Sequence, residues 1–218
     1  MAIDVERLKQ VRGYWFPKED TECSAVVFDE LPKLKQLPLK GNALAVQAGG
    51  NCGVFPVAMA DIFDRVVTFE PDEVNYECLV KNIDANPKIL HFHAGLSDRP
   101  GQGGMVGEHG EAYNLVNCGA LQMVENAGDI PLMTVDSLGL DACDLIYLDV
   151  EGFEDLALLG AEETIQKFKP VIVCENKGLI PNFPSDRDGS EEFREFVCTR
   201  FGYEVYGRLM RDDIFTCK

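Results

Sequence analysis

The sequence predicts a doubly wound α/β domain with a mostly parallel sheet and an antiparallel closing hairpin. Short apolar runs alternate with segments of helical periodicity, which is the pattern of βα units. The run Leu145–Leu148 is apolar at every position, as expected for a parallel strand that is covered on both faces. A glycine-rich turn joins the run Ala43–Val46 to a helical segment, which is how nucleotide-binding α/β folds begin. The chain of 218 residues provides a full core for one domain, whereas two domains would be cramped.

Composition restricts the class of protein. Hydrophobic residues make up 46% of the chain, yet no apolar run approaches the ~18 residues that a membrane span needs. The first residues do not read as a signal peptide, so we expect a soluble, cytoplasmic protein. The eight cysteines are scattered without a C-x-x-C pair, which predicts buried thiols in a reducing compartment rather than a zinc site or a disulfide framework.

The net charge of −17 argues against partners that carry phosphates. Binding to DNA, RNA or an anionic membrane normally needs a basic face, and the basic residues here are dispersed along the chain. We therefore expect neither a nucleic acid nor a membrane as the partner of this protein. An acid-rich surface that only maintains solubility explains the charge as well.

Residues 1–41 are expected to form an N-terminal helical cap on a domain of residues 42–218. Residues 4–12 have apolar positions near helical spacing and predict a short amphipathic helix. The aromatic cluster around Trp15 then packs at the edge of the core or covers a ligand site, and edge packing is favoured. Residues 24–37 predict a second helix, which leads into the first strand of the sheet.

The strand, turn and helix of residues 42–63 form the expected binding element. Gly49 and Gly53 lie in the turn, and Pro56 lies in the first turn of the helix, where a missing N–H costs little. The second strand, residues 65–69, ends at Glu70, about 20 residues after the first glycine. A nucleotide fold places at this position the carboxylate that accepts the ribose hydroxyl groups.

The middle of the chain predicts a helix at 71–83, a strand at 89–94 and then an irregular segment at 99–128. This long, glycine-rich segment predicts short strands and loops near an acceptor pocket, with His109, Tyr113 and Asn117 as possible acceptor contacts. A surface insertion without a function explains the segment equally well.

The second half of the chain restores the α/β alternation. The strand before Asp149 is followed by a helix at 153–168 and by a strand at 171–174, which ends in Glu175 and Asn176. Parallel strands that lie side by side deliver Asp149, Glu175 and Asn176 to the same edge of the sheet. A helix at 191–201 and strands near 203–206 and 214–217 predict the closing hairpin.

Two motifs resemble those of the FkbM family of class I S-adenosylmethionine-dependent methyltransferases. The family pattern D-x-G-A-N-x-G matches residues 47–53, with Gln47 in place of the acid and Gly50 in place of the alanine. The pattern D-x-E-G-x-E, followed by L-x-G-A, matches residues 149–154 and 159–161 almost letter for letter. The resemblance covers about residues 42–176 and implies a seven-stranded, Rossmann-like methyltransferase sheet.

The resemblance also implies a site, with S-adenosylmethionine as the cofactor and S-adenosylhomocysteine as its product. The expected acceptor is an oxygen of a small molecule or sugar. Asp149 and Glu151 are the candidate catalytic bases, and Glu175 and Asn176 are the candidate substrate contacts. The implied cofactor contacts are Gln47, Ala48, Gly49, Gly50, Asn51, Gly53, Glu70, Pro71, Leu96, Ser97 and Asp149.

Several alternatives stay open at this point. Asp149, Glu175 and Asn176 are similar to the magnesium ligands of catechol-type O-methyltransferases, although hydrogen bonding to the acceptor explains them too. Glu151 or Glu154 can instead cap the helix that follows. An NAD-type oxidoreductase is disfavoured because no register of residues 47–53 fits G-x-G-x-x-G. The loss of the acid at Gln47 also permits a non-catalytic relative that binds cofactor weakly or binds only a partner. The sequence specifies neither the acceptor nor the oligomeric state.

Overall fold

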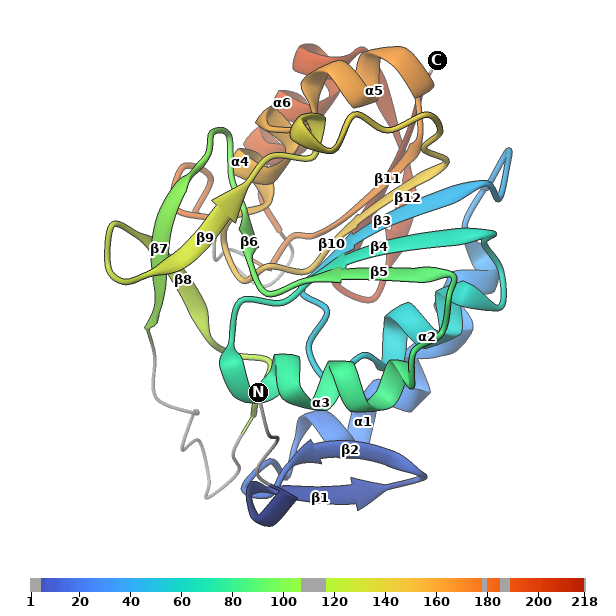
Figure 1. The fold of residues 1–218 in the computed structure, drawn as a ribbon. Coiled ribbons are helices and arrows are strands. Elements are labelled where there is room, and N and C mark those ends of the chain that lie inside the picture. Colours follow the sequence, from blue (N-terminus) through green and yellow to red (C-terminus); the bar gives the residue numbers. More distant parts are fainter. Residues whose placement is uncertain (1–4, 107–116, 178–179, 185–188, 218) are drawn as a thin grey trace.

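The computed structural model describes residues 5–106, 117–177, 180–184 and 189–217 (Figure 1). Its strands are β1 (Leu8–Val11), β2 (Tyr14–Pro17), β3 (Leu44–Ala48), β4 (Arg65–Phe69), β5 (Ile89–Phe92), β6 (Gly95–Leu96), β7 (Gly101–Val106), β8 (Gln122–Glu125), β9 (Ile130–Met133), β10 (Leu145–Leu148), β11 (Val171–Glu175), β12 (Tyr203–Leu209) and β13 (Asp212–Cys217). Its α-helices are α1 (Cys23–Glu30), α2 (Val54–Ala60), α3 (Glu73–Ile83), α4 (Glu154–Leu159), α5 (Glu162–Phe168) and α6 (Glu191–Phe201). The 3₁₀ helices are η1 (Val5–Arg7), η2 (Leu31–Gln36) and η3 (Asp136–Leu138).

A seven-stranded sheet with the order β12-β13-β11-β10-β3-β4-β5 forms the centre of the molecule. The five strands from β11 to β5 are parallel, and the β12–β13 hairpin pairs antiparallel with β11. This topology confirms the predicted doubly wound, mostly parallel sheet with an antiparallel closing hairpin. The strand order reverses between β3 and β10, and in open α/β sheets ligands bind at such a switch point, beyond the carboxyl ends of the strands.

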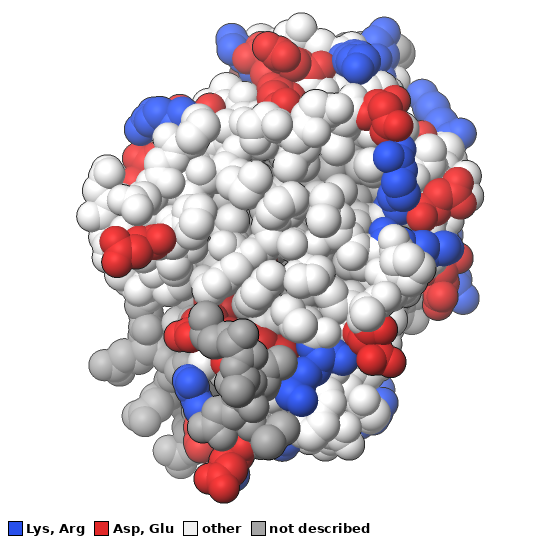
Figure 2. Space-filling model, in the orientation of Figure 1, with Lys and Arg blue, Asp and Glu red and all other residues white. Residues whose placement is uncertain are grey.

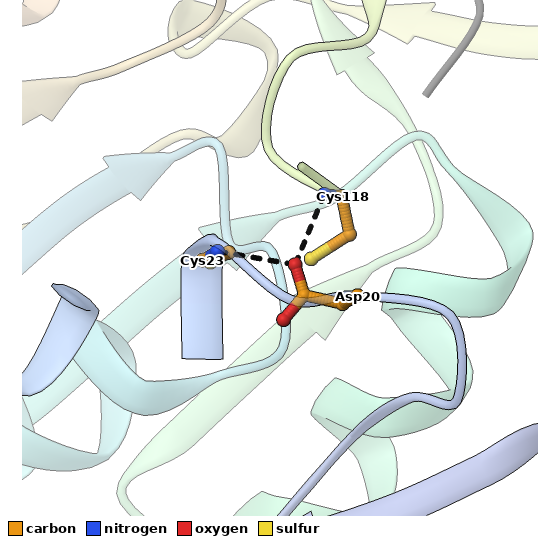
Figure 3. A group of neighbouring side chains, drawn as sticks. All are labelled: Asp20, Cys23 and Cys118. Atoms are coloured by element: carbon orange, nitrogen blue, oxygen red, sulfur yellow. Dashed lines mark hydrogen bonds between the residues drawn. The ribbon is translucent and has the colours of Figure 1, made fainter. Parts of the chain in front are cut away.

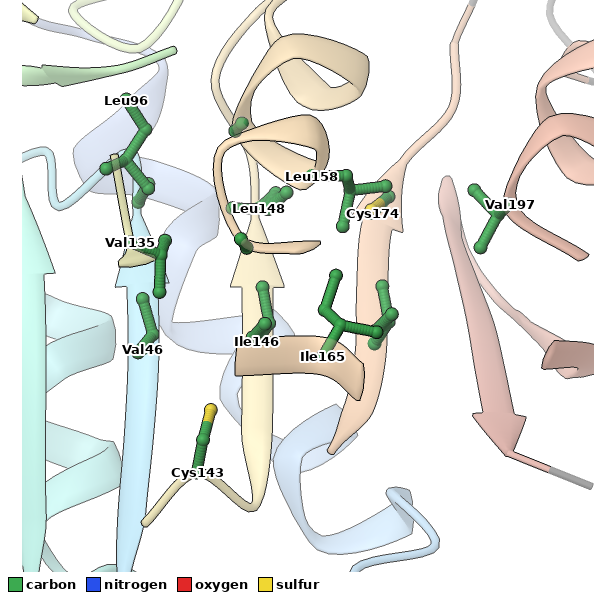
Figure 4. Close-up of a cluster of buried hydrophobic side chains, with 14 of the residues drawn as sticks. Val46, Leu96, Val135, Cys143, Ile146, Leu148, Leu158, Ile165, Cys174 and Val197 are labelled. Carbon is green, nitrogen blue, oxygen red and sulfur yellow. The ribbon is translucent and has the colours of Figure 1, made fainter. Parts of the chain in front are cut away.

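Helices cover both faces of the sheet, as the apolar strands require (Figure 1). On one face, Val46, Ile146 and Cys174 of β3, β10 and β11 pack against Leu158 and Ile165 of α4 and α5 (Figure 4). The other face packs against α2, α3 and η2, through residues such as Met59, Leu79 and Leu34. Helix α6 begins where predicted, and α3 begins two residues after the predicted start, because Asp72 and Ser190 accept hydrogen bonds from the first exposed N–H groups of each helix.

A second, four-stranded sheet with the order β6-β9-β7-β8 occupies the region after β5. The prediction of short strands and loops for residues 99–128 is confirmed for its described part, but the sequence did not predict that these strands form a sheet. The glycines of β7 permit close packing: a Cβ atom on Gly103 would lie 2.6 Å from the sulfur of Met123 on the paired strand β8. His109 and Tyr113 lie outside the described residues.

The helix predicted at residues 4–12 is wrong. These residues form η1 and then β1, which pairs with β2 in an antiparallel hairpin. Arg12 and Gly13 make the turn, and both have positive φ angles, 52° and 86°. A two-residue turn of this kind matches the twist of the paired strands and therefore favours the hairpin over a helix. Trp15 on β2 packs against α3, since Lys81 Nζ lies 4.6 Å from the centre of its ring.

The single helix predicted at residues 153–168 is also wrong in one respect. It is divided into α4 and α5 at Gly160 and Ala161. A side chain on Gly160 would overlap the backbone oxygen of Ser97, so the chain passes very close to the end of β6 there. The carboxylate of Asp136 accepts hydrogen bonds from the N–H groups of Glu163 and Thr164, and so begins the second helix.

Charged residues are dispersed on the face shown in Figure 2, where Lys and Arg alternate with Asp and Glu around a broad uncharged area. This face offers no continuous basic surface for a polyanion. Within the described part of the chain, every helix is too short or too polar to cross a lipid bilayer.

Candidate active site

A pocket of about 400 Å³ lies at the carboxyl ends of β3, β4, β10 and β11, beside the switch point of the sheet. Its volume is in the range of small-molecule sites, about 300–1,000 Å³. One wall comes from the N-terminal region, where Val26 and Val27 of α1 and Lys33 of η2 line the cavity. The segment Asn117–Gly119 lines another part of the wall. The described chain therefore surrounds the position where an α/β fold binds its ligand.

Glu70 lines this pocket from the end of β4, as the sequence predicts. Its carboxylate accepts hydrogen bonds from the backbone N–H of Asn51 at 2.6 Å and from that of Asp72 at 2.8 Å. Burial raises the pKa of Glu70 to about 8, although these two hydrogen bonds act in the opposite direction. Glu70 thus connects the turn after β3 to the end of β4 and presents a carboxylate to the cavity.

The turn after β3 lines the pocket through Gln47, Ala48, Gly49, Gly50 and Asn51. Gln47 is only 2% exposed, and its carboxamide donates to the carbonyl of Gly49 at 2.8 Å and accepts a hydrogen bond from Thr68. Gln47, which replaces the acid of the family pattern, therefore stabilises the turn through its side-chain amide. Gly49 has a φ angle of +80°, and a Cβ atom there would overlap the backbone oxygen of Asp149.

The other predicted cofactor contacts divide into two groups. Pro71 and Leu96 line the pocket. Gly53 and Ser97 do not: Gly53 precedes α2 and lies against the backbone of Leu79, and Ser97 is completely buried with its hydroxyl directed to Asp98 and Glu125. The small residue at position 53 thus serves the packing of α2 against α3.

Asp149, Glu151 and Glu175 bring carboxylate oxygens within 4.8 Å of one another on the pocket wall. Lys177 lies between two of them, with Nζ 2.6 Å from both Glu151 and Glu175. Burial, and next the charge of Glu175, raises the pKa of Asp149 well above its usual range. Three acids next to one lysine cannot all ionise at low cost, so a proton is retained in this cluster near neutral pH.

Glu154 holds the loop that carries Glu151. Its buried carboxylate accepts hydrogen bonds from the N–H groups of Val150 at 3.0 Å and Gly152 at 3.1 Å. The loop needs this support because Glu151 itself has a positive φ angle of 54°. Burial raises the pKa of Glu154 to about 8. Of the two acids considered for a structural role, Glu154 has it, while Glu151 faces the pocket.

Asn176, predicted as a substrate contact, does not belong to this cluster and is not among the residues that line the pocket. Its side chain is completely buried and donates to Ser190 O at 3.1 Å and to Asp213 Oδ2 at 2.7 Å. Its own oxygen accepts the N–H of Ser190 at 2.8 Å. The predicted magnesium trio is therefore not assembled, and the ammonium group of Lys177 already neutralises Glu175.

The structure adds polar residues that sequence reasoning missed. Tyr147, Asp212 and Lys33 line the pocket and form one network, in which the tyrosine hydroxyl donates to Asp212 at 2.6 Å. Lys33 Nζ lies 2.6 Å from the same carboxylate. These residues come from β10, β13 and η2, so no spacing in the sequence connects them. Only the apolar run around Tyr147 gave a signal, since a tyrosine in a buried strand needs a hydrogen-bond partner.

Cysteines from distant segments also meet at the pocket wall, whereas the sequence predicted buried thiols with neither a zinc site nor a disulfide framework. Cys23, Cys52 and Cys118 line the cavity, and the sulfur atoms of Cys52 and Cys118 are 4.0 Å apart. Figure 3 shows Cys118 and Cys23 around the carboxylate of Asp20. All eight cysteines are free thiols.

Comparison with known proteins gives a family for this arrangement. The family model described as "Methyltransferase FkbM domain" matches residues 48–205, which is most of the chain. None of the curated proteins matches the sequence significantly.

Several solved structures are similar to this chain at low sequence identity. A methyltransferase FkbM from Methylobacillus flagellatus is 18% identical with a TM-score of 0.54, and the match covers 81% of this chain but 43% of that one. A SAM-dependent methyltransferase from Aquifex aeolicus is 13% identical, with a TM-score of 0.48 and coverages of 90% and 92%. A 16S rRNA methyltransferase of T. thermophilus, solved with AdoMet and guanosine, is 13% identical, with a TM-score of 0.46 and coverages of 97% and 49%. The likeness to the Methylobacillus flagellatus structure, at 18% identity, shows a common fold alone.

Proposed function

Since the chain belongs to the FkbM methyltransferase family, we propose that it transfers the methyl group of S-adenosylmethionine to an oxygen of a small molecule or sugar, releasing S-adenosylhomocysteine. The observation that carries this proposal is that Glu70 and Asp149 line the same pocket at the switch point of the sheet. The carboxylate of Glu70 suits a ribose, and that of Asp149 lies where the acceptor would meet the cofactor.

The residues present fit the cofactor. Each oxygen of Glu70 accepts one backbone N–H and retains a lone pair for a ribose hydroxyl group. Leu96 and Phe69 provide apolar surface in the same cavity for the adenine ring. The turn that begins at Gln47 offers backbone groups to the methionine portion. No carboxylate of this turn is available for the cofactor's ammonium group, so the acids near Asp149 supply the negative charge.

To catalyse this transfer, the protein mainly has to align the acceptor oxygen with the methyl group and remove the proton of the acceptor hydroxyl. S-adenosylmethionine supplies a methyl group on a sulfonium, which is already a strong electrophile. The walls from α1 and β10 exclude water and align the acceptor oxygen in line with the methyl group. Asp149, whose pKa is raised, then removes the proton of the acceptor hydroxyl as a general base. Lys177 keeps Glu151 and Glu175 in place beside it.

The nature of the acceptor follows from the polar end of the pocket. Glu151, Glu175 and Lys177 offer both acceptors and donors of hydrogen bonds, which suits a molecule rich in hydroxyl groups. The net charge of −17 and the dispersed basic residues disfavour a nucleic acid or an anionic membrane as acceptor. We propose residues 1–41 as a cap on the domain of residues 42–218, because α1 and η2 within them contribute one wall of the pocket. The free thiols favour a reducing compartment such as the cytoplasm.

One specific observation favours a second candidate, a non-catalytic relative. Gln47 replaces the family acid, and its carboxamide is already hydrogen-bonded within the turn. Such a protein would bind cofactor weakly and transfer nothing. An NAD-type oxidoreductase is less favoured, since the turn does not follow the dinucleotide pattern.

A transfer experiment tests the proposal. The full chain is incubated with S-adenosylmethionine labelled on the methyl group and with a panel of hydroxyl-bearing small molecules and sugars, and labelled product is measured by mass spectrometry. We expect acceptor-dependent formation of S-adenosylhomocysteine, and a rate at least ~100-fold lower in Asp149→Asn, as loss of a general base predicts. Cofactor binding without transfer to any acceptor would favour the non-catalytic candidate. A thermal shift with NAD and none with S-adenosylmethionine would contradict both.

A further inference from the structure

Four side chains from three separate segments converge at one side of the pocket: three cysteines line its wall, and Asp20 is completely buried beside them. Asp20 and Cys23 belong to the N-terminal region, Cys52 belongs to the turn after β3, and Cys118 lies between β7 and β8. The carboxylate oxygen of Asp20 and the sulfur atoms of Cys23 and Cys118 all lie within 4.8 Å of one another. Figure 3 shows the backbone of both cysteines hydrogen-bonded to the carboxylate of Asp20. Thiols and a carboxylate that converge in this way are suited to binding a metal ion, and the proposed methyl transfer makes no use of them.

We propose that Asp20, Cys23 and Cys118 bind a zinc ion, with Cys52 placed to complete the set of ligands. Thiolate sulfur and carboxylate oxygen are zinc ligands, whereas magnesium and calcium prefer oxygen alone. In a tetrahedral zinc site, with Zn–S of about 2.3 Å and Zn–O of about 2.0 Å, neighbouring ligand atoms are about 3.5–3.8 Å apart. Cys52 and Cys118, with sulfur atoms 4.0 Å apart, are already near this separation.

The immediate surroundings support the same assignment. Cys118 is 1% exposed, and its sulfur lies 4.0 Å from that of Cys52, so the thiols are already brought together at a position shielded from water. Asn51 Oδ1 lies 3.5 Å from the sulfur of Cys118 and 3.7 Å from that of Cys23, so a further oxygen faces the same point.

A zinc ion at this position would connect three parts of the pocket wall. Asp20 also accepts hydrogen bonds from the N–H groups of Cys23 at 3.1 Å and Cys118 at 3.3 Å, so the segments already meet around its carboxylate. The metal would add a strong cross-link between the N-terminal cap and the turn that contains Asn51. We expect it to stabilise the folded chain, because a ligand that binds only the folded state raises the free energy of unfolding.

Metal binding by the full chain tests the inference without any assay of methyl transfer. The protein is stripped with a chelator and titrated with Zn²⁺ in competition with a chromophoric chelator, and then with Co²⁺ as a spectroscopic probe. We expect one zinc ion for each chain and, with cobalt, sulfur-to-metal charge-transfer bands together with the visible bands of a tetrahedral site. Cys118→Ser should weaken zinc binding at least ~100-fold, the upper range for loss of support at a metal site. Cys198→Ser, a partly buried cysteine of α6, should bind zinc as the wild type does.

A second measurement uses the wild type alone, so its result does not depend on whether the variant folds. Zinc should protect Cys23 and Cys118 from alkylation, read peptide by peptide in a mass spectrometer, and leave the labelling of Cys198 unchanged. The inference is overturned if zinc protects no cysteine of the cluster, or if the cobalt complex lacks the sulfur-to-metal bands. It is also overturned if folded Cys118→Ser binds zinc as tightly as the wild type.

Discussion

Gly49 lies against the backbone of Asp149 so closely that a Cβ atom on the glycine would overlap the carbonyl oxygen of the aspartate. The contact joins the turn after β3 to the end of β10, and the N–H of Asp149 donates to the carbonyl of Ala48 at 3.1 Å in the same region. The glycine of the family pattern is therefore required by the packing of two neighbouring strand ends. This packing brings the cofactor turn and the proposed catalytic acid into one pocket.

The first prediction measures the cost of that contact. Gly49→Ala should lower the free energy of unfolding by more than about 3 kcal/mol, because a positive φ angle and a steric overlap act together. Gly202→Ala is the matched control: its φ angle is +75°, but nothing lies within 4 Å of the added carbon. The control should lose only about 1–2 kcal/mol in urea denaturation. Equal losses in the two variants would show that the contact with Asp149 costs nothing.

The second prediction concerns the buried glutamates. Glu70 and Glu154 have pKa values of about 8 in the folded chain and an ordinary value of 4.5 when exposed. Between these values the folded state binds more protons than the unfolded state, so stability falls as pH rises. Their contribution is complete below pH about 4.5 and is lost by pH about 8. Each group should contribute a slope of about 1.4 kcal/mol per pH unit in this window.

Urea denaturation across this pH range measures the slope. The side chain of Glu154→Gln cannot titrate, so the slope of stability against pH should become shallower by the contribution of one glutamate. A loss of stability that is the same at every pH would not change this slope. If the variant keeps the slope of the wild type, the account of Glu154 as a buried, protonated clamp is wrong.

The third prediction concerns Lys177. Its positive charge lowers the pKa of Asp149, which burial and Glu175 hold well above the ordinary range. In Lys177→Met the acidic limb of the rate profile for methyl transfer should move to higher pH by about 1 unit or more, because the base becomes harder to ionise. Lys167→Met, on the exposed side of α5, is the control. A profile that stays in place in Lys177→Met would remove Asp149 as the base.

The fourth prediction distinguishes a structural residue from a site residue. Asn176→Ala removes two hydrogen bonds to the backbone of Ser190 and one of the hydrogen bonds of Asp213, which keeps its ion pair with Arg194. The loss should cost about 2–4 kcal/mol of stability in chemical denaturation. The folded variant should bind cofactor as the wild type does. Loss of transfer at unchanged stability would restore Asn176 to the acceptor site.

The central sheet could be predicted because parallel strands covered on both faces leave continuous apolar runs, as in Leu145–Leu148. Glu70 could be predicted because the length of one βα unit fixes its distance from the turn. The hairpin at Arg12 and Gly13 escaped prediction, since two short strands give the same apolar spacing as one short helix.

The remaining misses depend on tertiary structure. Asn176 follows its strand as expected, but its side chain is buried away from the pocket, where it forms hydrogen bonds with Ser190 and Asp213. The side chains of Lys33, Asp212 and Cys118 reach the pocket from segments that are far apart in the sequence. A local sequence pattern cannot predict that such segments lie together. The break at Gly160 reflects the close passage of Ser97, which again is visible only in the folded chain.

The most direct test of the central claim is a calorimetric titration of the wild type and Glu70→Ala with S-adenosylmethionine and S-adenosylhomocysteine. At pH about 9, where Glu70 with its pKa of about 8 is ionised, the account predicts saturable binding to the wild type and a loss of about 1.5–3 kcal/mol in the variant, the range for a hydrogen bond to a charged group. Glu73→Ala, which removes an exposed acid from the first turn of α3, should bind as the wild type does. Equal affinity of the wild type and Glu70→Ala, or no heat of binding from either ligand, would contradict the assignment of this pocket.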